Sequence, residues 1–212
     1  MSLLVAKLGG SLADSHEREA WLAGFVSARQ PLILVPGGGP FAREVRLAQT
    51  REGFDDVEAH RRALRAMERF GAVLAGHSDR FALAASRAEI AAALAGGQIP
   101  VWLPSAMALA APEIPASWDA TSDALAAWLA GTCAATALLL VKSCAVAPPV
   151  HLRALAAEGI VDPLFPHFAA RSGAKIHIAG PAALPFAREI LQSGGVPGAV
   201  ATPVEGACLA PA

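Results

Sequence analysis

The chain has 212 residues, a net charge of −1 and a composition that is 54% hydrophobic and only 17% charged. This composition excludes a disordered chain, and the near-neutral charge gives no electrostatic footprint for nucleic acid or an anionic membrane. The length suits one sizeable hydrophobic core, so we expect a single domain over residues 1–212.

Two features favour a cytoplasmic protein. The three cysteines (Cys133, Cys144 and Cys208) are odd in number and lack metal-ligand spacing, and the first residues do not resemble a signal peptide. Residues 124–141 carry no charge and have the length of a membrane span, but Gly131 divides them. We therefore expect a helix that ends near Gly131, followed by a buried strand, and no membrane partner.

The first motif is Lys7-Leu8-Gly9-Gly10-Ser11, which follows the apolar run Leu3–Ala6 and precedes a helical pattern that starts near Asp14. Glycines let backbone N–H groups face one concavity, and a helix N-terminus adds a positive dipole end. A phosphate site and an ordinary tight turn both fit this fragment.

A second strand–glycine–helix unit follows within forty residues. The apolar run Leu32–Val35 ends in Pro36-Gly37-Gly38-Gly39-Pro40, and a helix is expected from Phe41 to Gln49. Parallel strands bring both glycine turns to the carboxyl edge of one sheet, where open α/β folds bind ligands. Neither turn has the spacing of the dinucleotide-binding fingerprint or of a Walker A loop.

Further strands and helices alternate along the rest of the chain. A long helix is expected over residues 55–77, where His60 lies among charged side chains and an ordinary solvated position would also explain it. The remaining strands are expected over 99–103, 137–141, 175–179 and 199–202. The pattern predicts an α/β fold, a three-layer αβα sandwich with a mostly parallel central sheet.

Lysine is rare in this chain and its placement is informative. Only Lys7, Lys142 and Lys175 are lysines among 17 basic residues, and each adjoins an apolar strand-like run, which suits sites that need a compact point charge. Asp119 and Asp123 flank a helix cap at Thr121 or Ser122. Acids there often serve only the cap and the helix dipole, but they also suit Mg²⁺, bound directly or through water.

Three motifs in this order resemble the amino acid kinase superfamily, which phosphorylates carboxylates, carbamate and phosphates with ATP. They are Lys7-x-Gly9-Gly10-Ser11, Pro36-Gly37-Gly38-Gly39 and Ser122-Asp123-Ala124-Leu125-Ala126-Ala127, and the resemblance covers nearly the whole chain. It implies an ATP-dependent kinase that uses Mg²⁺ and a small-molecule phosphate substrate.

The resemblance also implies roles for individual residues. Lys7, Gly9, Gly10 and Ser11 would hold the transferring phosphoryl group and the nucleotide. Gly37, Gly38, Gly39 and His60 would bind the acceptor phosphate. Asp123 would orient the lysines, with Lys142 preferred to Lys175 as the second catalytic lysine, and Asp119 and Asp123 would serve Mg²⁺, possibly through water.

A narrower resemblance concerns a short subgroup that contains the archaeal kinase of methanofuran biosynthesis. It rests on Ala59-His60, Ser117-Trp118-Asp119, Leu138–Lys142 and Gly159–Asp162. That kinase converts [5-(aminomethyl)furan-3-yl]methyl phosphate to the diphosphate. The resemblance implies the same acceptor, in methanofuran- or methylofuran-type one-carbon metabolism, and a homo-oligomer.

One segment departs from the superfamily pattern. Lys142-Ser143-Cys144-Ala145-Val146 lacks the acid and the glycine that often follow this strand, and the C-terminal nucleotide lobe is short. Two other hypotheses therefore stay open. The first is a kinase of the same fold with an isoprenoid phosphate or carboxylate acceptor. The second is a non-catalytic binding or scaffold protein.

Overall fold

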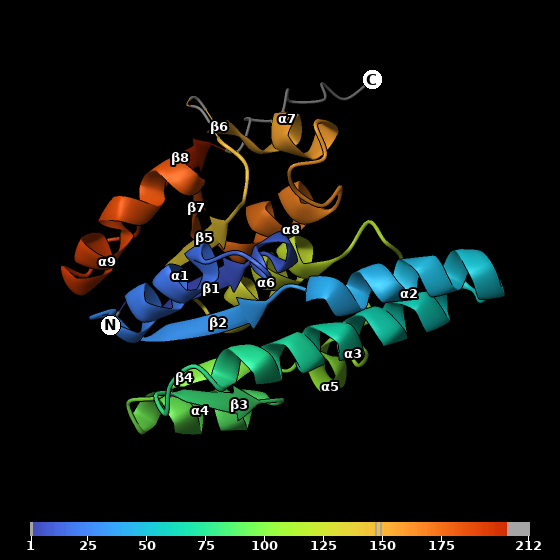
Figure 1. The fold of residues 1–212 in the computed structure, drawn as a ribbon, viewed down its shortest axis with the longest axis horizontal. Coiled ribbons are helices and arrows are strands. Elements are labelled where there is room, and N and C mark those ends of the chain that lie inside the picture. Colours follow the sequence, from blue (N-terminus) through green and yellow to red (C-terminus); the bar gives the residue numbers. More distant parts are fainter. Residues whose placement is uncertain (1, 147, 149, 203–212) are drawn as a thin grey trace, which may run out of the picture.

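The computed structural model describes residues 2–146, 148 and 150–202. In it, one twisted eight-stranded sheet lies between two layers of helices (Figure 1). The strands are β1 (Leu4–Leu8), β2 (Leu32–Pro36), β3 (Phe81–Ala84), β4 (Ile99–Trp102), β5 (Ala137–Val141), β6 (Val150–His151), β7 (Lys175–Ala179) and β8 (Ala199–Thr202). The predicted α/β sandwich with a mostly parallel sheet is confirmed.

The helices cover both faces of this sheet. They are α1 (Glu17–Val26), α2 (Gly39–Glu52), α3 (Asp56–Ala75), α4 (Arg87–Ala95), α5 (Ser105–Ala108), α6 (Ser122–Thr132), α7 (Leu152–Ala157), α8 (Phe165–Ser172) and α9 (Leu184–Gln192), with short 3₁₀ helices η1 (Gly10–Leu12) and η2 (Pro181–Ala183).

The strand order is β3-β4-β2-β1-β5-β7-β8-β6, and every neighbouring pair is parallel except β7 and β8. β1 lies between β2 and β5, and Leu8 at its end pairs with Pro36 and with Val141. The three strands therefore end level, at one edge of the sheet.

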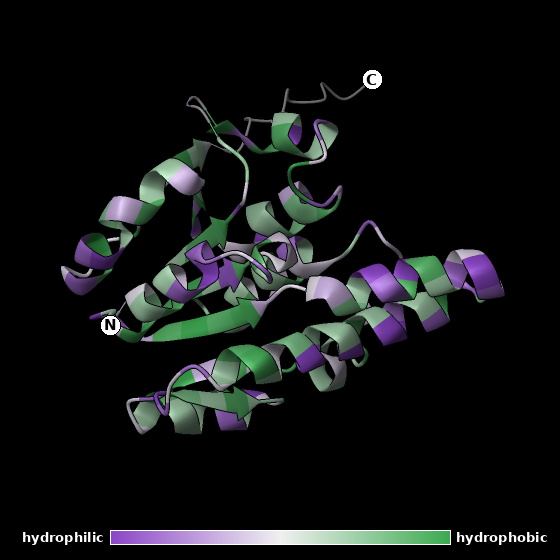
Figure 2. Ribbon diagram, in the orientation of Figure 1, coloured by the Kyte–Doolittle hydropathy of each residue, from purple (hydrophilic) through white to green (hydrophobic). Residues whose placement is uncertain are grey.

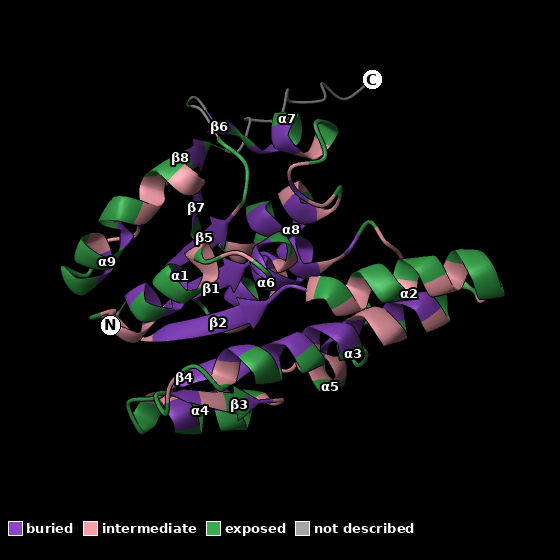
Figure 3. Ribbon diagram, in the orientation of Figure 1, coloured by how far each residue is buried: buried purple, intermediate pink, exposed green. Residues whose placement is uncertain are grey.

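Alternation along β1 divides the core into two layers. Val5 packs with α6 and α8, whereas Leu4, Ala6 and Leu8 pack on the other face with α1 and α9. Lys7 shares the Val5 face because side chains alternate along a strand, so it points toward α6. Figures 2 and 3 show the central strands β1, β2 and β5 as hydrophobic and buried, whereas α2 has no buried residue.

All six predicted strands are present, but the sequence did not predict β3 or β6. β6 has two residues and β3 has four. Such short strands carry too little periodicity to be recognised. The first helix begins at Glu17 rather than near Asp14, because residues 10–12 form η1 and the Ser15 hydroxyl accepts the Glu17 amide.

The uncharged segment at residues 124–141 has the predicted division. Helix α6 ends at Thr132, and β5 begins at Ala137 inside the sheet. Among the described residues, no helix has both the length and the hydrophobicity needed to cross a membrane.

Candidate active site

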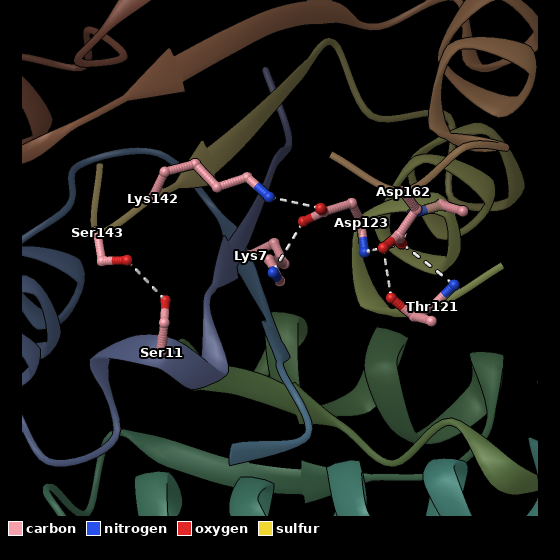
Figure 4. Close-up of polar contacts among 8 residues, drawn as sticks. Lys7, Ser11, Thr121, Asp123, Lys142, Ser143 and Asp162 are labelled. Atoms are coloured by element: carbon pink, nitrogen blue, oxygen red, sulfur yellow. Dashed lines mark hydrogen bonds and ion pairs between the residues drawn. The ribbon is translucent and has the colours of Figure 1, made fainter. Parts of the chain in front are cut away.

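A buried carboxylate lies between two lysines at the edge where β1 and β5 end. The Lys7 Nζ is 2.8 Å from Asp123 Oδ1, and the Lys142 Nζ is 2.5 Å from Asp123 Oδ2 (Figure 4). Lys7 and Asp123 are 5% and 3% exposed. The Asp123 carboxylate therefore contacts two ammonium groups at once and holds both in place.

The fold explains why these three side chains meet. Lys7 lies within β1, Lys142 directly follows the neighbouring β5, and Asp123 lies in the first turn of α6 on the face toward which Lys7 points. Lys175 does not join them: it is exposed and begins β7, where it pairs with Ala137 at the start of β5. Lys175 therefore lies at the amino ends of the parallel strands, opposite the carboxyl ends where Lys7 and Lys142 meet.

Burial and charge shift the pKa values within this cluster. Burial acts to raise the pKa of Asp123, but Lys7 and Lys142 outweigh it and leave that pKa below its ordinary value. Burial lowers the pKa of Lys142, as does the nearby charge of Lys7, although Asp123 opposes both effects. The carboxylate is thus firmly ionised, whereas Lys142 gives up its proton more readily than a solvated lysine.

Asp162 is a half-buried residue of this site to which the sequence analysis gave no role of its own. Its Oδ2 accepts hydrogen bonds from the backbone amides of Asp123 (2.9 Å) and Ala124 (3.0 Å), and its Oδ1 accepts one from the Thr121 hydroxyl (2.5 Å). The Thr121 amide donates to it as well (3.1 Å). Asp162 therefore caps α6 from outside the helix and fixes the backbone that carries Asp123.

The surroundings of Asp162 disfavour the ionised form of its carboxyl group. Burial and the nearby Asp123 raise the pKa of Asp162, against the opposing effect of its hydrogen bonds. The one sequence signal that pointed to it was the stretch Gly159–Asp162 in the narrower resemblance. No local pattern placed it beside Thr121.

The two predicted glycine turns lie against each other beside the lysines. The Gly37 amide donates to the Leu8 carbonyl at 2.9 Å, which joins the second turn to the end of β1. A Cβ on Gly10 would lie 2.4 Å from the Gly39 nitrogen, so backbone packs directly on backbone. Gly39 has a φ of +55°, in the left-handed region that favours glycine. On the other side of the first turn, the Ser143 hydroxyl donates to that of Ser11 at 2.9 Å.

A pocket adjoins these turns, between α2, α3 and residues 117–125. Gly38 and His60 both line it. The two helices are antiparallel: the Arg69 guanidinium is 4.1 Å from the Phe41 ring centroid, and Gln49 donates to Asp56 at 2.9 Å. Gly38 is thus at one end of the pocket and His60 at the other.

His60 is therefore not on the solvated helix face, and only 6% of it is exposed. Burial lowers its pKa, which favours the neutral imidazole. The pocket joins it to the glycine turns, but the geometry does not bring it to the same point as Gly38.

Asp119 and Asp123 are not brought together as a metal site. Asp119 is exposed, and both carboxylate oxygens of Asp123 contact lysines. Within residues 2–146, 148 and 150–202, no group of three or more His, Cys, Asp or Glu side chains could hold a metal ion. The Mg²⁺ role of these two residues stays a prediction, and the donor set fits the ion only through water.

No protein-family model matches the chain, and no curated protein sequence matches it. Solved structures do match the chain. Uridylate kinase from Archaeoglobus fulgidus superposes with a TM-score of 0.67 at 18% identity, covering 95% of this chain and 100% of that one. The chain has the amino acid kinase fold.

Two further structures with this fold have other substrates in their names. An isopentenyl phosphate kinase has a TM-score of 0.56 at 18% identity, over 93% of this chain and 99% of that one. Carbamate kinase from Giardia lamblia, bound to AMP-PNP, has a TM-score of 0.59 at 13% identity, over 95% and 98%. At these identities the likeness establishes the fold, and the reaction has to be inferred from the site.

Proposed function

We propose that this chain is an ATP-dependent phosphotransferase that converts a small phosphate monoester into a diphosphate. The observation that carries this proposal is the pair of lysines on one buried carboxylate, at the edge where both glycine turns end. Transfer between two phosphates must overcome repulsion between anions, and two fixed ammonium groups with backbone donors beside them serve that purpose.

In the proposed reaction, an oxygen of the acceptor phosphate bonds to the γ-phosphorus of ATP. The bond to the β,γ-bridging oxygen breaks, and ADP leaves. Lys7 and the Gly9-Gly10 turn hold the phosphoryl group in transit, with Ser11 beside them, and Lys142 offsets the charge that develops. The acceptor oxygen is already anionic, so no general base is required.

Asp123 acts by holding the two ammonium groups in place. Mg²⁺, when bound with the nucleotide, supplies further neutralisation of phosphate charge. Because both oxygens of Asp123 already contact lysines, this residue and the exposed Asp119 would reach the ion through water.

The pocket beside Gly38 is the proposed site of the acceptor, with Gly37 and Gly39 completing the turn at its inner end. The narrower sequence resemblance favours [5-(aminomethyl)furan-3-yl]methyl phosphate as the compound, in methanofuran- or methylofuran-type cofactor biosynthesis. A different acceptor is the second candidate, because structures with this fold include an isopentenyl phosphate kinase and a carbamate kinase.

The test is ADP release with ATP, Mg²⁺ and a panel that contains the furan phosphate, isopentenyl phosphate, UMP, carbamate and aspartate. We expect turnover with a monophosphate, a diphosphate product by mass spectrometry and none with the carboxylates. Lys7→Ala should abolish ADP release, whereas Lys175→Ala, at the opposite edge of the sheet, should retain it. A folded protein that binds no ATP by calorimetry would overturn the proposal and favour the binding or scaffold hypothesis.

We further propose that the protein acts in the cytoplasm as a homo-oligomer. The cysteine usage supports the location. Apolar side chains that are half or more exposed on α2 and α3, namely Leu47, Val57 and Val73, support self-association. Light scattering that gives a monomer at micromolar concentration would contradict the second part.

A further inference from the structure

The pocket proposed for the acceptor is closed at its outer end by interlocked side chains. The Arg46 guanidinium is 3.7 Å from the centroid of the Trp118 ring. The Trp118 Nε1 donates to Gln49 Oε1 at 2.7 Å. Gln49 in turn donates to Asp56 at 2.9 Å. We call Arg46, Gln49 and Trp118 the end wall.

The end wall is fixed from three parts of the chain. Arg46 and Gln49 belong to α2, Asp56 begins α3, and Trp118 lies in the connection before α6. The Arg46 guanidinium stacks on the Trp118 ring, and the hydrogen bond from Nε1 to Gln49 fixes the edge of the indole. Together they restrict motion of the ring. Trp118 is thus a built element of the pocket.

The position of the end wall sets a length. Gly38 and Arg46 both line the pocket along α2, and eight residues of helix span about 12 Å. The pocket lining includes the apolar Ala63, Leu64 and Met67, together with the hydroxyl-bearing Thr121 and Ser122. An acceptor whose phosphate lies at Gly38 therefore has room for a compact body before it meets Trp118.

The polar groups near the end wall are few. His60 lies there with its pKa lowered by burial, so it offers one donor and one acceptor nitrogen rather than a charge. Among the described residues that line the pocket, none is an Asp or Glu. Arg46 is a charged side chain that lines the pocket at this end, and its guanidinium stacks on Trp118. The Trp118 ring, held in this way, sets the shape of that end.

We propose that Trp118, held by Arg46 and Gln49, limits the acceptor to short monophosphates with a body the size of one five-membered ring or a five-carbon chain. Longer prenyl phosphates and nucleoside monophosphates are excluded by the indole. This inference rests on the proposed function, because it takes this pocket as the acceptor site.

The test compares isopentenyl phosphate with geranyl phosphate by calorimetry in the absence of nucleotide. The wild type should bind the short phosphate at least tenfold more tightly. Trp118→Ala should reduce that preference tenfold or reverse it, while Trp118→Phe should largely keep it. Trp128→Ala, which removes an indole outside this pocket, is the matched control and should leave the ratio unchanged.

Three results would overturn the inference: equal binding of both phosphates by the wild type, no binding of the short phosphate, or a ratio that Trp118→Ala leaves within twofold. If Trp118→Ala does not fold, Gln49→Ala removes the hydrogen bond that holds the indole, and the same ratio decides. A protein with the expected preference that releases no ADP would contradict the proposed function and leave the inference standing.

Discussion

A Cβ placed on Gly37 would lie 2.4 Å from the backbone nitrogen of Gly10. The turns that follow β1 and β2 therefore touch through bare backbone, and no side chain separates them. Contact this close sets the spacing between the proposed phosphoryl site and the proposed acceptor site. That spacing therefore depends on the absence of a Cβ at Gly10 and at Gly37.

Gly10→Ala should be severely damaging for this reason. The new Cβ would lie 2.4 Å from the Gly39 nitrogen and 2.9 Å from its Cα, so one turn must move. We expect a loss of about 1–3 kcal/mol in the free energy of unfolding, as for other overpacked sites. ADP release should fall about 100-fold, because misplacement on this scale has such an effect.

The matched control for this variant is Gly24→Ala in α1. There the nearest atom to the new Cβ is the Leu191 Cδ1 at 3.5 Å, an ordinary contact. We expect unchanged ADP release and equal or slightly higher stability, since alanine favours a helix. Equal activity of the two variants would contradict the close packing of the turns. Urea unfolding and the ADP assay measure both.

Asp123→Asn should leave the ammonium groups of Lys7 and Lys142 without the carboxylate that both of them contact. Removal of one partner from a buried ion pair costs about 3–5 kcal/mol, and we expect a loss of that order in urea unfolding. The double variant Asp123→Asn with Lys142→Met should recover part of the stability, because one of the repelling charges is gone. It should recover no ADP release. A single variant as stable as the wild type would contradict the charge arrangement.

Asp162→Asn tests the cap on α6. Asparagine in this position lacks the carboxylate charge and has one acceptor oxygen in place of two. The Thr121 hydroxyl and the backbone amides of Thr121, Asp123 and Ala124, which share the two oxygens of Asp162, cannot all keep their hydrogen bonds. We expect about 1–2 kcal/mol of lost stability, as for other helix caps, together with a lower kcat. KM for the acceptor should change less, because Asp162 does not line the pocket.

The matched control is Asp79→Asn, an exposed aspartate whose side chain has no ion pair among the residues described. It should behave as the wild type in both assays. Equal stability and kcat for Asp162→Asn and Asp79→Asn would show that the cap does not position Asp123.

The pH dependence of kcat/KM should report Lys142. Burial, together with the charge of Lys7, lowers the pKa of this lysine, while Asp123 and Asp162 oppose the shift. The ammonium form of Lys142 is lost as pH rises through this lowered pKa. Activity should therefore begin to decline at a pH below about 10.4, the ordinary pKa of lysine. Lys142→Arg should move the alkaline limb to higher pH, because arginine stays protonated. A limb that this substitution leaves in place would contradict the assignment.

The sequence predicted the parts of the fold that local pattern determines. The apolar runs Leu32–Val35 and Ala137–Val141 were recognised because buried parallel strands are hydrophobic throughout. The meeting of Lys7 with Lys142 could be anticipated, since both lie at the ends of strands that an α/β fold brings to one edge. The preference for Lys142 over Lys175 follows from the same rule.

Contacts between distant segments could not be predicted in this way. Asp162 reaches Asp123 across 39 residues, and Trp118 reaches Gln49 across 69. Neither partner carries a periodic or spacing signal for the other. The position of His60 depends likewise on the antiparallel packing of α2 and α3, which places it at the far end of the pocket from Gly38.

The cap that Asp162 places on α6 also determines when the site can form. Helix α6 can form from its own residues alone. Asp162, whose carboxylate caps the first turn of α6, comes later in the chain, after β5, β6 and α7. A contact between residues 39 positions apart closes a long loop, and the entropy of that closure is lost before the contact contributes stability. The lysine–aspartate cluster should therefore be among the last parts of the molecule to reach its native arrangement during folding. A chain released before residue 162 would have both glycine turns and both lysines, with no fixed anchor for the carboxylate between them.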